Sequence, residues 1–459
     1  MSKTAGDGPH ILIYPYPAPG HIIPLLDLTH LLLTRGLTVT VLVTPTDAPL
    51  LEPLLSNHPS SSIQPLVLPA PDAPTSSHFP FVAKIRAQGE LYDPILNWFR
   101  SQPTPPVAII SDVFLGWTHH LAIELGVPRV VFWPSCAFQW SISNCMWRDL
   151  PKRDDPDDDN SPISFPNIPN SPIFPWWQMS FVYGEYREGD PDWEFFRNSM
   201  LANVVSWGVV FNSFTELERV YIDHLKKEMG QDRVWTVGPL MLPEDDLVRH
   251  SKRGGPRAVP TENVMTWLDA KAKDSVVYVC FGSNFVLREQ QMSALAAALE
   301  CSGVHFIWCV KAADQENVAI VEGLADRVEG RGFVIKGWAP QVAILNHRAV
   351  GVFVTHCGWN SVLEGLSTGV MMLTWPISAD QFTNAMLLVD QLGVAIRACE
   401  GGDRIVPDSA ELSRLLVQSV GETRPERARV RELRDAALVA KKEGSSRKDL
   451  DEFVKQFED

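Results

Sequence analysis

Short apolar runs alternate with longer amphipathic segments along the first half of this chain. The runs are rich in Val, Ile and Leu, as buried parallel strands are. The segments between them place apolar residues three and four positions apart, which predicts helices. The predicted strands are 10–16, 37–43, 63–68, 107–111, 129–133, 208–212 and 234–237. The predicted helices are 22–34, 91–100, 117–125 and one that begins near residue 193.

The same alternation returns in the second half. The predicted strands there are 275–281, 305–310, 333–336, 351–355, 370–374 and 394–398. The predicted helices are 261–271, 289–301, one that starts at about 361, 382–392, 409–420, 424–442 and 447–457. Strands that alternate with helices of about ten residues or more indicate a parallel, doubly wound sheet. Two such series predict an α/β protein with two facing, doubly wound Rossmann-like domains and an interdomain cleft.

Two segments break this alternation. Residues 150–192 begin with the Pro-interrupted acidic run KRDDPDDDN (152–160), which should be solvated and mobile. Residues 242–260 are rich in charge, Gly and Pro and are the best candidate for a linker. The expected organisation is an N-terminal domain over 1–241, the linker over 242–260, a C-terminal domain over 261–442 and a final helix over 443–459.

Length and charge restrict the class of protein. The 459 residues exceed the roughly 250–300 at which one hydrophobic core stops growing, so two domains are expected. Apolar residues make up 45% and charged residues 21%, which is ordinary for a globular protein. The formal charge of −15 argues against a general nucleic-acid binder, which needs a surplus of Lys and Arg. A single bound nucleotide remains compatible with this charge, because helix N-termini bind phosphate locally.

The chain lacks the patterns of secretion and membrane insertion. Its first apolar run is too short and Pro-broken for a signal peptide, and no window reaches about 18 uninterrupted apolar residues. The seven cysteines are scattered without a CxxC pair, which suggests free thiols in a reducing compartment. We therefore expect a soluble cytoplasmic protein with neither a nucleic acid nor a membrane as a partner.

The stretch from Trp338 to Gln381 has the pattern of an anion site. Its strand 351–355 leads into the polar turn 356–360, and Ser361 and Glu364 then form a capping box, which predicts a helix start at about Ser361. A strand, a Gly-containing turn and a helix N-terminus present backbone N–H groups to an anion such as a diphosphate. The next strand brings the end of the stretch to the same rim, where open α/β sheets bind their ligands.

Two polar residues of the first half lie where strands end. His21 follows the first strand, near a helix N-terminus that disfavours the imidazolium, so this His should be neutral and available as a base near pH 7. Its alternative role is to cap the helix. Asp112 ends another strand of the same sheet, so the fold can bring it beside His21 to orient the imidazole. The alternative for Asp112 is to cap the following helix.

The stretch 338–381 resembles the sugar-nucleotide box of the plant family 1 glycosyltransferases, which glycosylate secondary metabolites. It matches the box over its full 44 residues, with the core THCGWNS intact. Met371 stands where the family usually has Pro, and Ser378 stands where Gly or Glu is common. Neither change removes a residue with donor-binding chemistry. The family's PxxGHxxP turn is present around His21, and its S-D-x-F turn is present at 111–114.

This resemblance implies a UDP-glycosyltransferase of GT-B architecture, in which the last helix crosses back onto the first domain. In the family, the His that corresponds to His21 takes the proton of the acceptor hydroxyl, and the Asp that corresponds to Asp112 holds the His and balances its charge. The acceptor oxygen attacks the anomeric carbon in line and inverts its configuration. The resemblance implies no metal ion and no cofactor, because the UDP-sugar is a co-substrate, and we expect a monomer.

The resemblance also implies the donor-binding residues. Trp338 stacks on the uracil and Gln341 lies beside the ribose, although Trp338 without the box would be interpreted as a core residue. Glu364 holds the ribose hydroxyls, a role that competes with its place in the capping box. The remaining donor-binding residues are Ala339, then Ser283, His356, Asn360 and Ser361 around the diphosphate, and Trp359, Asp380 and Gln381 facing the sugar.

The resemblance also indicates the class of donor and of acceptor. Gln at the position of Gln381 is associated with glucose donors in the family, so UDP-glucose is the expected donor, with UDP-xylose, UDP-rhamnose and UDP-galactose as alternatives. The acceptor pocket should be apolar and aromatic, because it has to bind a flat phenolic or flavonoid ring. Its candidate residues, each of which could instead belong to the core, are Tyr16, Phe114, Trp117, Phe138, Trp140, Trp177 and Tyr183.

Two other classes of protein share parts of this pattern. A nicotinamide-dependent oxidoreductase would also have doubly wound halves, but the first strand here ends in PAPGH rather than in G-x-G-x-x-G. A non-catalytic nucleotide-binding protein would be expected to have lost His21 or Asp112, and both are present. Within the class, the same pair could deprotonate a phenol for C-glycosylation. The leading prediction is an inverting transfer of glucose from UDP-glucose to a hydroxyl, which gives a β-glucoside.

Overall fold

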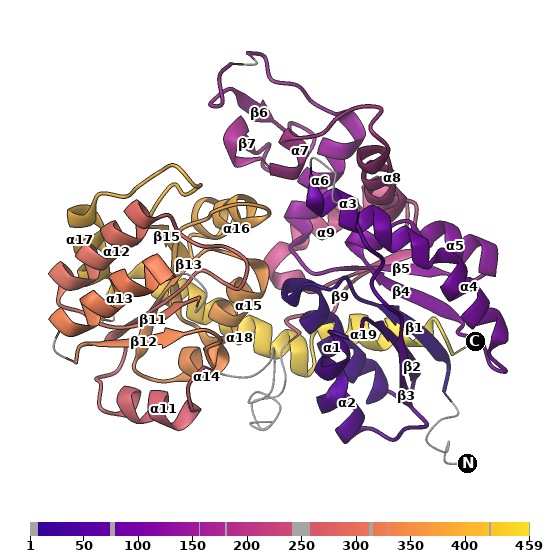
Figure 1. The fold of residues 1–459 in the computed structure, drawn as a ribbon, viewed down its shortest axis with the longest axis horizontal. Helices are drawn as coiled ribbons and strands as arrows, with labels where there is room; N and C mark the ends of the chain where they lie inside the picture. The colour runs from indigo at the N-terminus through magenta and orange to yellow at the C-terminus, as the bar shows by residue number, and fades with distance from the viewer. Residues whose placement is uncertain are drawn as a thin grey trace. The chain divides into compact units, whose positions relative to one another are not determined.

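The chain divides into two compact units. The computed structural model describes residues 8–73, 79–155, 157–179, 181–240, 258–311, 315–328, 330–421 and 424–458. Unit 1 comprises Met1–Met241 and Ala440–Asp459, and unit 2 comprises Leu242–Val439 (Figure 1). Residues 242–257 of the predicted linker lie outside the described residues.

Unit 1 is built on a parallel sheet. Its described strands lie in the order β3-β2-β1-β4-β5-β8-β9, so the order of connection reverses between β1 and β4 (Figure 1). The first strand ends at Tyr14, two residues earlier than predicted. The strands are β1 (His10–Tyr14), β2 (Thr38–Val43), β3 (Ile63–Val67), β4 (Ala108–Asp112), β5 (Arg129–Trp133), β8 (Gly208–Phe211) and β9 (Val234–Thr236).

The helices of unit 1 include several that the sequence pattern did not predict, among them α3, α6 and α9. The described helices are α1 (Pro19–Leu33), η1 (Ala48–Leu51), α2 (Glu52–Asn57), α3 (Pro80–Gln88), η2 (Gly89–Leu91), α4 (Tyr92–Ser101), η3 (Val113–Leu115), α5 (Thr118–Leu125), α6 (Ala137–Asp149), η4 (Trp176–Gln178), α7 (Phe181–Gly184), α8 (Pro191–Val204), α9 (Thr215–Met229) and α19 (Ser445–Lys455). An antiparallel hairpin of β6 (Pro162–Ser164) and β7 (Ile173–Pro175) lies in the segment predicted to be irregular.

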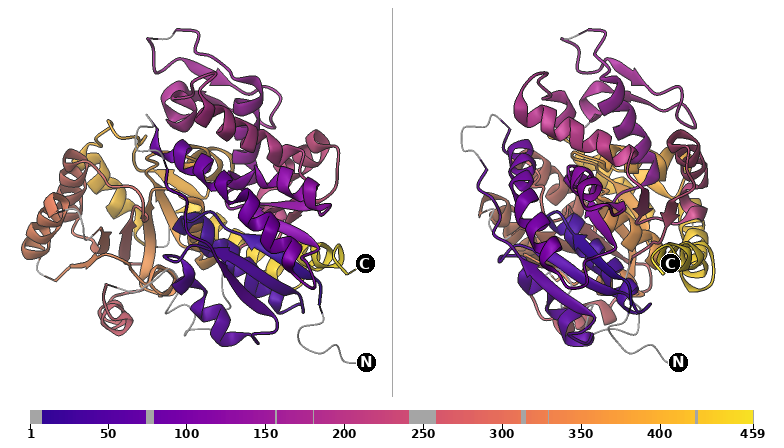
Figure 2. Two further views of the ribbon diagram at one scale, coloured as in Figure 1. Left: turned by 45° about the vertical axis from the view of Figure 1, so that its right-hand side comes forward. Right: turned by 90° about the vertical axis from the view of Figure 1, so that its right-hand side faces the viewer.

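The C-terminal helix α19 belongs to the core of unit 1. Leu450 and Phe453 join a buried cluster that also contains residues of β1 and α1. The carboxylate of Asp449 accepts hydrogen bonds from the backbone N–H and the hydroxyl of Thr236 on β9, at 2.8 and 2.9 Å. Figure 2 follows this helix, in yellow, from two further directions. A segment more than 200 residues away in the sequence therefore completes this unit.

Unit 2 repeats the plan of unit 1 with a second parallel sheet. Its described strands lie in the order β12-β11-β10-β13-β14-β15, so the connection reverses between β10 and β13. The strands are β10 (Val276–Cys280), β11 (His305–Val310), β12 (Gly332–Lys336), β13 (Val350–Thr355), β14 (Met371–Thr374) and β15 (Ala395–Arg397). The helices are α11 (Thr261–Asp269), α12 (Glu289–Ser302), α13 (Gln315–Arg327), α14 (Gln341–Asn346), α15 (Trp359–Thr368), α16 (Gln381–Met386), the π-helix η5 (Leu387–Gln391), α17 (Ser409–Ser419) and α18 (Pro425–Lys442).

Three general properties of the chain follow from the described residues. The seven cysteines are free thiols, as predicted. No described helix combines the length and the apolar character needed to cross a membrane. Among the described side chains, no three or more His, Cys, Asp or Glu gather in a way that could hold a metal ion.

Candidate active site

The candidate base lies at the switch point of the unit 1 sheet. Ligands of open α/β sheets bind where the strand connection reverses, at the carboxyl ends of the strands. Here β1 and β4 are neighbours at that point, and α1 follows β1 while Asp112 ends β4. Helix α1 begins at Pro19, three residues earlier than predicted, because Pro fits the first helical position, where no backbone N–H is needed. His21 is therefore in the first turn of α1.

His21 and Asp112 form the predicted contact. Nδ1 of His21 lies 2.8 Å from Oδ2 of Asp112, and the other carboxylate oxygen accepts the backbone N–H of Phe114 at 3.0 Å. The His side chain is 21% exposed, whereas the Asp side chain is fully buried. A carboxylate that accepts from Nδ1–H fixes the tautomer in which Nε2 carries the lone pair. The arrangement therefore offers Nε2 as a proton acceptor.

The two roles considered for Asp112 coexist. One oxygen caps the short helix η3, which begins at Val113, and the other holds His21. The predicted capping role of His21 is not observed, because the N-cap of α1 is Ala18, without a side-chain bond.

Aromatic rings surround the imidazole. The ring centroids of His21 and Phe114 are 4.8 Å apart, and Tyr16 meets His21 edge-on at 5.7 Å. The ring of Phe114 also contacts Phe81 on α3 and Phe196 on α8, with centroid distances of 5.2 and 6.2 Å. The rings of Phe81 and Phe114 are only half-buried. Flat apolar rings beside a base are suited to hold an aromatic hydroxyl compound.

The other predicted acceptor residues lie at different places in unit 1. Trp117 is buried against Tyr14, and Phe138 is buried and stacked on Tyr221 at 4.6 Å, so both belong to the core here. Trp177 lies half-buried in η4. Tyr183 is buried and donates its hydroxyl hydrogen bond to the carbonyl of Pro151 at 2.8 Å.

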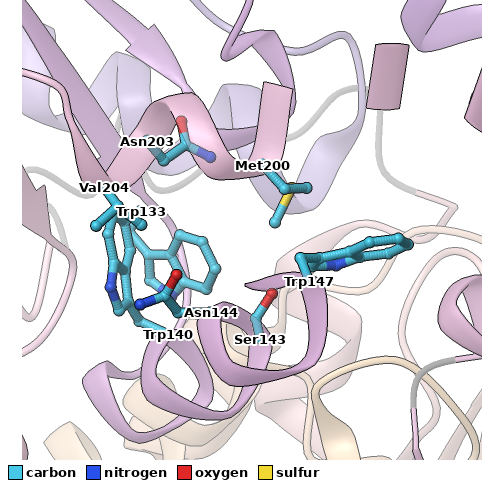
Figure 3. A pocket seen from close by; sticks show the side chains of 8 residues that line it. All are labelled: Trp133, Trp140, Ser143, Asn144, Trp147, Met200, Asn203 and Val204. Carbon is cyan, nitrogen blue, oxygen red and sulfur yellow. The ribbon is translucent and has the colours of Figure 1, made fainter. Parts of the chain in front are cut away.

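Trp140, the remaining acceptor candidate, lines a small cavity between α6 and α8 (Figure 3). The cavity has a volume of about 10 Å³, which is the room that one water molecule needs and is too small for an aromatic ring. Among the described residues, the buried indole Nε1 of Trp140 has no hydrogen-bond partner. The cavity walls are Trp133, Trp140, Ser143, Asn144, Trp147, Met200, Asn203 and Val204.

His356 lies at the switch point of the unit 2 sheet. It directly follows β13, and its imidazole is held between the backbones of Gly282 and Gly358. A Cβ at either glycine would lie 2.5 Å from Nε2 of the ring, and Gly282 has φ +73°. Burial lowers the pKa of His356 to about 4, so the ring is neutral at pH 7. Its buried Nδ1 has no hydrogen-bond partner among the described residues.

The predicted capping box at Ser361 is wrong. Helix α15 begins at Trp359 with Gly358 as its N-cap, so Ser361 and Glu364 lie inside the helix. Both instead contact Gln341, whose Nε2 donates to the Ser hydroxyl at 3.0 Å and to the Glu carboxylate at 2.6 Å. The box residues of the predicted ribose region are thus held together by side-chain hydrogen bonds.

Other members of the predicted donor site lie near these strand ends. Trp338 and Ala339 precede α14, with the Trp half-buried and the Ala buried. Ser283 lies half-buried just after β10, while Trp359 is buried and Asn360 half-buried in the first turn of α15.

The end of the box forms a closed loop. The side-chain carbonyl of Gln381 accepts the backbone N–H groups of Ile377 and Ser378, at 2.8 and 3.1 Å. Nδ2 of Asn384 donates to the carboxylate of Asp380 and to the backbone carbonyl of Cys357, both at 2.9 Å. Asn384 therefore ties the loop before α16 to the turn after β13.

Sequence reasoning missed several residues of these sites. Phe81 and Phe196 come from helices α3 and α8, and only the tertiary packing brings them to His21. The hydroxyl of Tyr278 on β10 donates a hydrogen bond to the side-chain oxygen Oε1 of Gln341 at 3.0 Å. Asn384 lies one helical turn after Asp380, and that spacing of four residues is the signal that could have indicated it.

The geometry agrees with comparisons to known proteins. Residues 242–400 match the family model described as UDP-glucoronosyl and UDP-glucosyl transferase. The chain is 52% identical to a flavonol 3-O-glucosyltransferase of Arabidopsis thaliana, with 97% of this chain and 95% of that one covered. The solved structure of Arabidopsis thaliana UGT89C1 with UDP-L-rhamnose has a TM-score of 0.80 and 37% identity, and covers 98% of this chain and 99% of that chain. The solved structure of the same Arabidopsis thaliana protein with quercetin has a TM-score of 0.78 and 36% identity. The match covers 98% of this chain and 100% of that chain.

These findings and the two Rossmann-like units define a glycosyltransferase of the GT-B fold that uses a UDP-sugar. The chain belongs to plant family 1 of the UDP-glycosyltransferases, as its identity to the flavonol 3-O-glucosyltransferase over nearly its whole length shows.

Proposed function

We propose that the enzyme transfers glucose from UDP-glucose to a hydroxyl of a small phenolic or flavonoid acceptor and forms a β-glucoside. The observation that carries this proposal is the hydrogen bond of 2.8 Å between Nδ1 of His21 and the buried carboxylate of Asp112. A protein that only binds a nucleotide has no need of an oriented base beside aromatic rings. A relative named for flavonol glucosylation and a solved structure with quercetin support the class of acceptor.

The proposed reaction is a single displacement. The acceptor hydroxyl gives its proton to Nε2 of His21 while its oxygen attacks the anomeric carbon of the sugar. The new carbon–oxygen bond forms as the bond to the β-phosphate of UDP breaks, and the electron pair leaves with UDP. Attack opposite the leaving group converts an α-linked donor into a β-glucoside. Asp112 stabilises the imidazolium that forms, and general base catalysis of this kind contributes roughly 10²–10⁴-fold in rate.

His356 is suited to hold the diphosphate. The ring is neutral, so one of its nitrogens carries a proton and can donate a hydrogen bond to a phosphate oxygen. A buried nitrogen such as its Nδ1, for which the described residues supply no partner, calls for a hydrogen bond with another molecule. The N-terminus of α15 follows two residues later and offers backbone N–H groups and a positive dipole end to the same anion. Together these groups would neutralise charge on the departing UDP.

Glu364 and Gln341 are suited to hold the ribose. A carboxylate can accept hydrogen bonds from two adjacent hydroxyls, and the amide of Gln341 already fixes one oxygen of Glu364 at 2.6 Å. The half-buried Trp338, three residues before Gln341, offers a flat face for the uracil. With the capping box absent, Glu364 has no competing role at the helix start.

Gln381 and Asp380 are proposed to select the sugar. Two loop amides hold the carbonyl oxygen of Gln381, which leaves the amide NH₂ on the opposite side as a donor to a sugar hydroxyl. The neighbouring carboxylate of Asp380 supplies acceptors. The second candidate donor is UDP-rhamnose, because a protein 37% identical to this chain has been solved with UDP-L-rhamnose.

The proposal is tested by mass-spectrometric detection of transfer from UDP-glucose, UDP-galactose, UDP-xylose and UDP-rhamnose to a set of phenols and flavonoids. We expect the largest kcat/KM with UDP-glucose. Gln381→Glu keeps an oxygen for the loop amides but removes the NH₂ donor, so it should lower kcat/KM for UDP-glucose about 10-fold or more, the cost of one buried hydrogen bond. Gln381→His should shift the preference toward UDP-galactose. Unchanged donor preference in both variants would contradict the role of Gln381.

A further inference from the structure

Arg129 is a buried cation at the start of β5. The residue is 1% exposed, and its guanidinium is held by hydrogen bonds to protein groups. Nε donates to the hydroxyl of Ser111 at 2.8 Å, and Nη1 donates to Oδ1 of Asn203 at 3.0 Å and to the hydroxyl of Ser206 at 2.8 Å. Burying a guanidinium is costly unless an opposite charge compensates it.

The side chain of Arg129 follows β4 toward the candidate base. In the sheet, its Cα pairs with Ile109, three residues before Asp112. The guanidinium nevertheless reaches the end of β4, where Nη2 lies 3.4 Å from the backbone carbonyl of Asp112. The hydrogen bond from Nε to the hydroxyl of Ser111 also holds the guanidinium beside the residue that precedes Asp112. The cation thus lies against the backbone of the residue whose carboxylate holds His21.

The negative charge of Asp112 acts on Arg129 through space. No carboxylate of the described residues lies within ion-pair distance of the guanidinium. Burial lowers the pKa of Arg129, and the negative charge of Asp112 raises it. Both groups are buried, so the attraction between them is weakly screened by solvent and salt. Asp112 therefore contacts His21 through its carboxylate and Arg129 through its backbone carbonyl.

We propose that Arg129 is a positioning residue that keeps the His21–Asp112 pair free of an extra proton, so that the base stays available to the acceptor hydroxyl at lower pH. This inference rests on the proposed function, in which His21 takes that proton. A nearby positive charge disfavours protonation of either the imidazole or the carboxylate, whichever group of the coupled pair would hold the proton. Arg129 acts through Asp112 and does not touch the substrate.

Among the described residues, Tyr16 and His119 are the other titratable groups that act on these side chains. Tyr16 lies beside His21, and burial together with the charge of Asp112 raises its pKa to about 12, so it stays protonated in any ordinary assay. On α5, His119 faces Arg129, and burial, Arg129 and His120 lower its pKa. Helix α8 contributes the uncharged Asn203. His119 is therefore the group that a control must address.

The test is the pH dependence of kcat/KM with UDP-glucose and a phenolic acceptor. Arg129→Gln removes the charge, and we expect the midpoint of the acidic limb to move upward by roughly one pH unit. Asn203→Asp leaves Arg129 in place but neutralises it with a new carboxylate, so the limb should move in the same direction. Arg129→Lys keeps the charge while losing the planar fork, and its midpoint should stay near that of the unaltered enzyme.

Two controls separate this role from a structural one. Ser206→Ala removes one hydrogen bond of Arg129 without changing the charge, and His119→Gln removes the neighbouring titration; neither should move the limb. Thermal unfolding of the full chain, measured by calorimetry, reports whether each variant is folded as the unaltered protein is. If Arg129→Gln does not fold, Asn203→Asp decides the question. The inference would be overturned if the unaltered enzyme transfers glucose but the midpoint of the acidic limb does not move in the folded variants that alter the charge. Absence of transfer by the unaltered protein would instead overturn the proposed function.

Discussion

The imidazole of His356 links burial to the pH dependence of stability. Its pKa falls from 6.5 to about 4 in the folded state, because burial penalises the charged form. Between these values the unfolded chain binds more protons than the folded one, so the free energy of unfolding decreases as the pH falls through this window. At 1.36 kcal/mol per unit, the full effect is on the order of 3 kcal/mol.

We expect His356→Gln to lose this part of the pH dependence. Urea unfolding at about pH 7 and about pH 4.5 should show a smaller loss of stability on acidification than in the unaltered protein. His120→Gln is the matched control, because His120 is exposed, and it should leave the pH dependence unchanged. Equal loss on acidification with and without His356 would show that its protonation is not linked to unfolding.

Several single residues could be predicted from the sequence. Two strand ends in one parallel sheet allowed a contact of His21 with Asp112, and the resemblance to the family indicated it; the structure shows the two side chains 2.8 Å apart. The capping role of Glu364 was wrong, because α15 begins two residues earlier than the Ser–Glu spacing indicated. Phe81 and Phe196 had no local signal, since their positions beside Phe114 depend on how α3 and α8 pack.

At the scale of elements, the turn after β10 shows how tightly the backbone approaches His356. Gly282 has φ +73°, and a Cβ there would lie 2.5 Å from Nε2 of the ring. We expect Gly282→Ala to destabilise the protein by about 1–3 kcal/mol and to weaken UDP binding, because both the backbone and the imidazole have to shift.

Gly303 provides the matched control for this substitution. It has a similar φ of +70° but has no atom within 4 Å of a Cβ, so Gly303→Ala carries the backbone strain without the clash. Gly303→Ala should lower the stability measured by thermal unfolding less than Gly282→Ala does. Calorimetry should show an unchanged affinity for UDP. Equal effects of the two substitutions on UDP binding would contradict the close approach to His356.

Strands were predicted more completely than helices. Buried parallel strands are continuous apolar runs, and those of both sheets were predicted within a few residues. Helix α6 was missed because Ser, Asn, Gln and Cys interrupt its apolar face, although tertiary contacts bury both sides of it. The hairpin of β6 and β7 was missed because each strand has only three residues, which is too short for an alternating pattern to be recognised.

At the scale of the whole molecule, the chain uses one architectural plan twice. Each unit has a parallel sheet whose connection reverses beside a histidine of the candidate site, His21 after β1 and His356 after β13. The last helix, α19, returns to the core of unit 1. The sequence pattern predicted both sheets, and only the resemblance to the family indicated the return of the last helix.

The most direct test of the account is the anomeric configuration of the product. The unaltered enzyme would be incubated with UDP-α-glucose and quercetin, and the purified product examined by proton NMR. An oxygen-linked glucoside with the large anomeric coupling of a β-linkage is the predicted result. An α-linked glucoside, a carbon-linked glucoside or the absence of any transferred sugar would contradict direct displacement by an acceptor hydroxyl that His21 deprotonates.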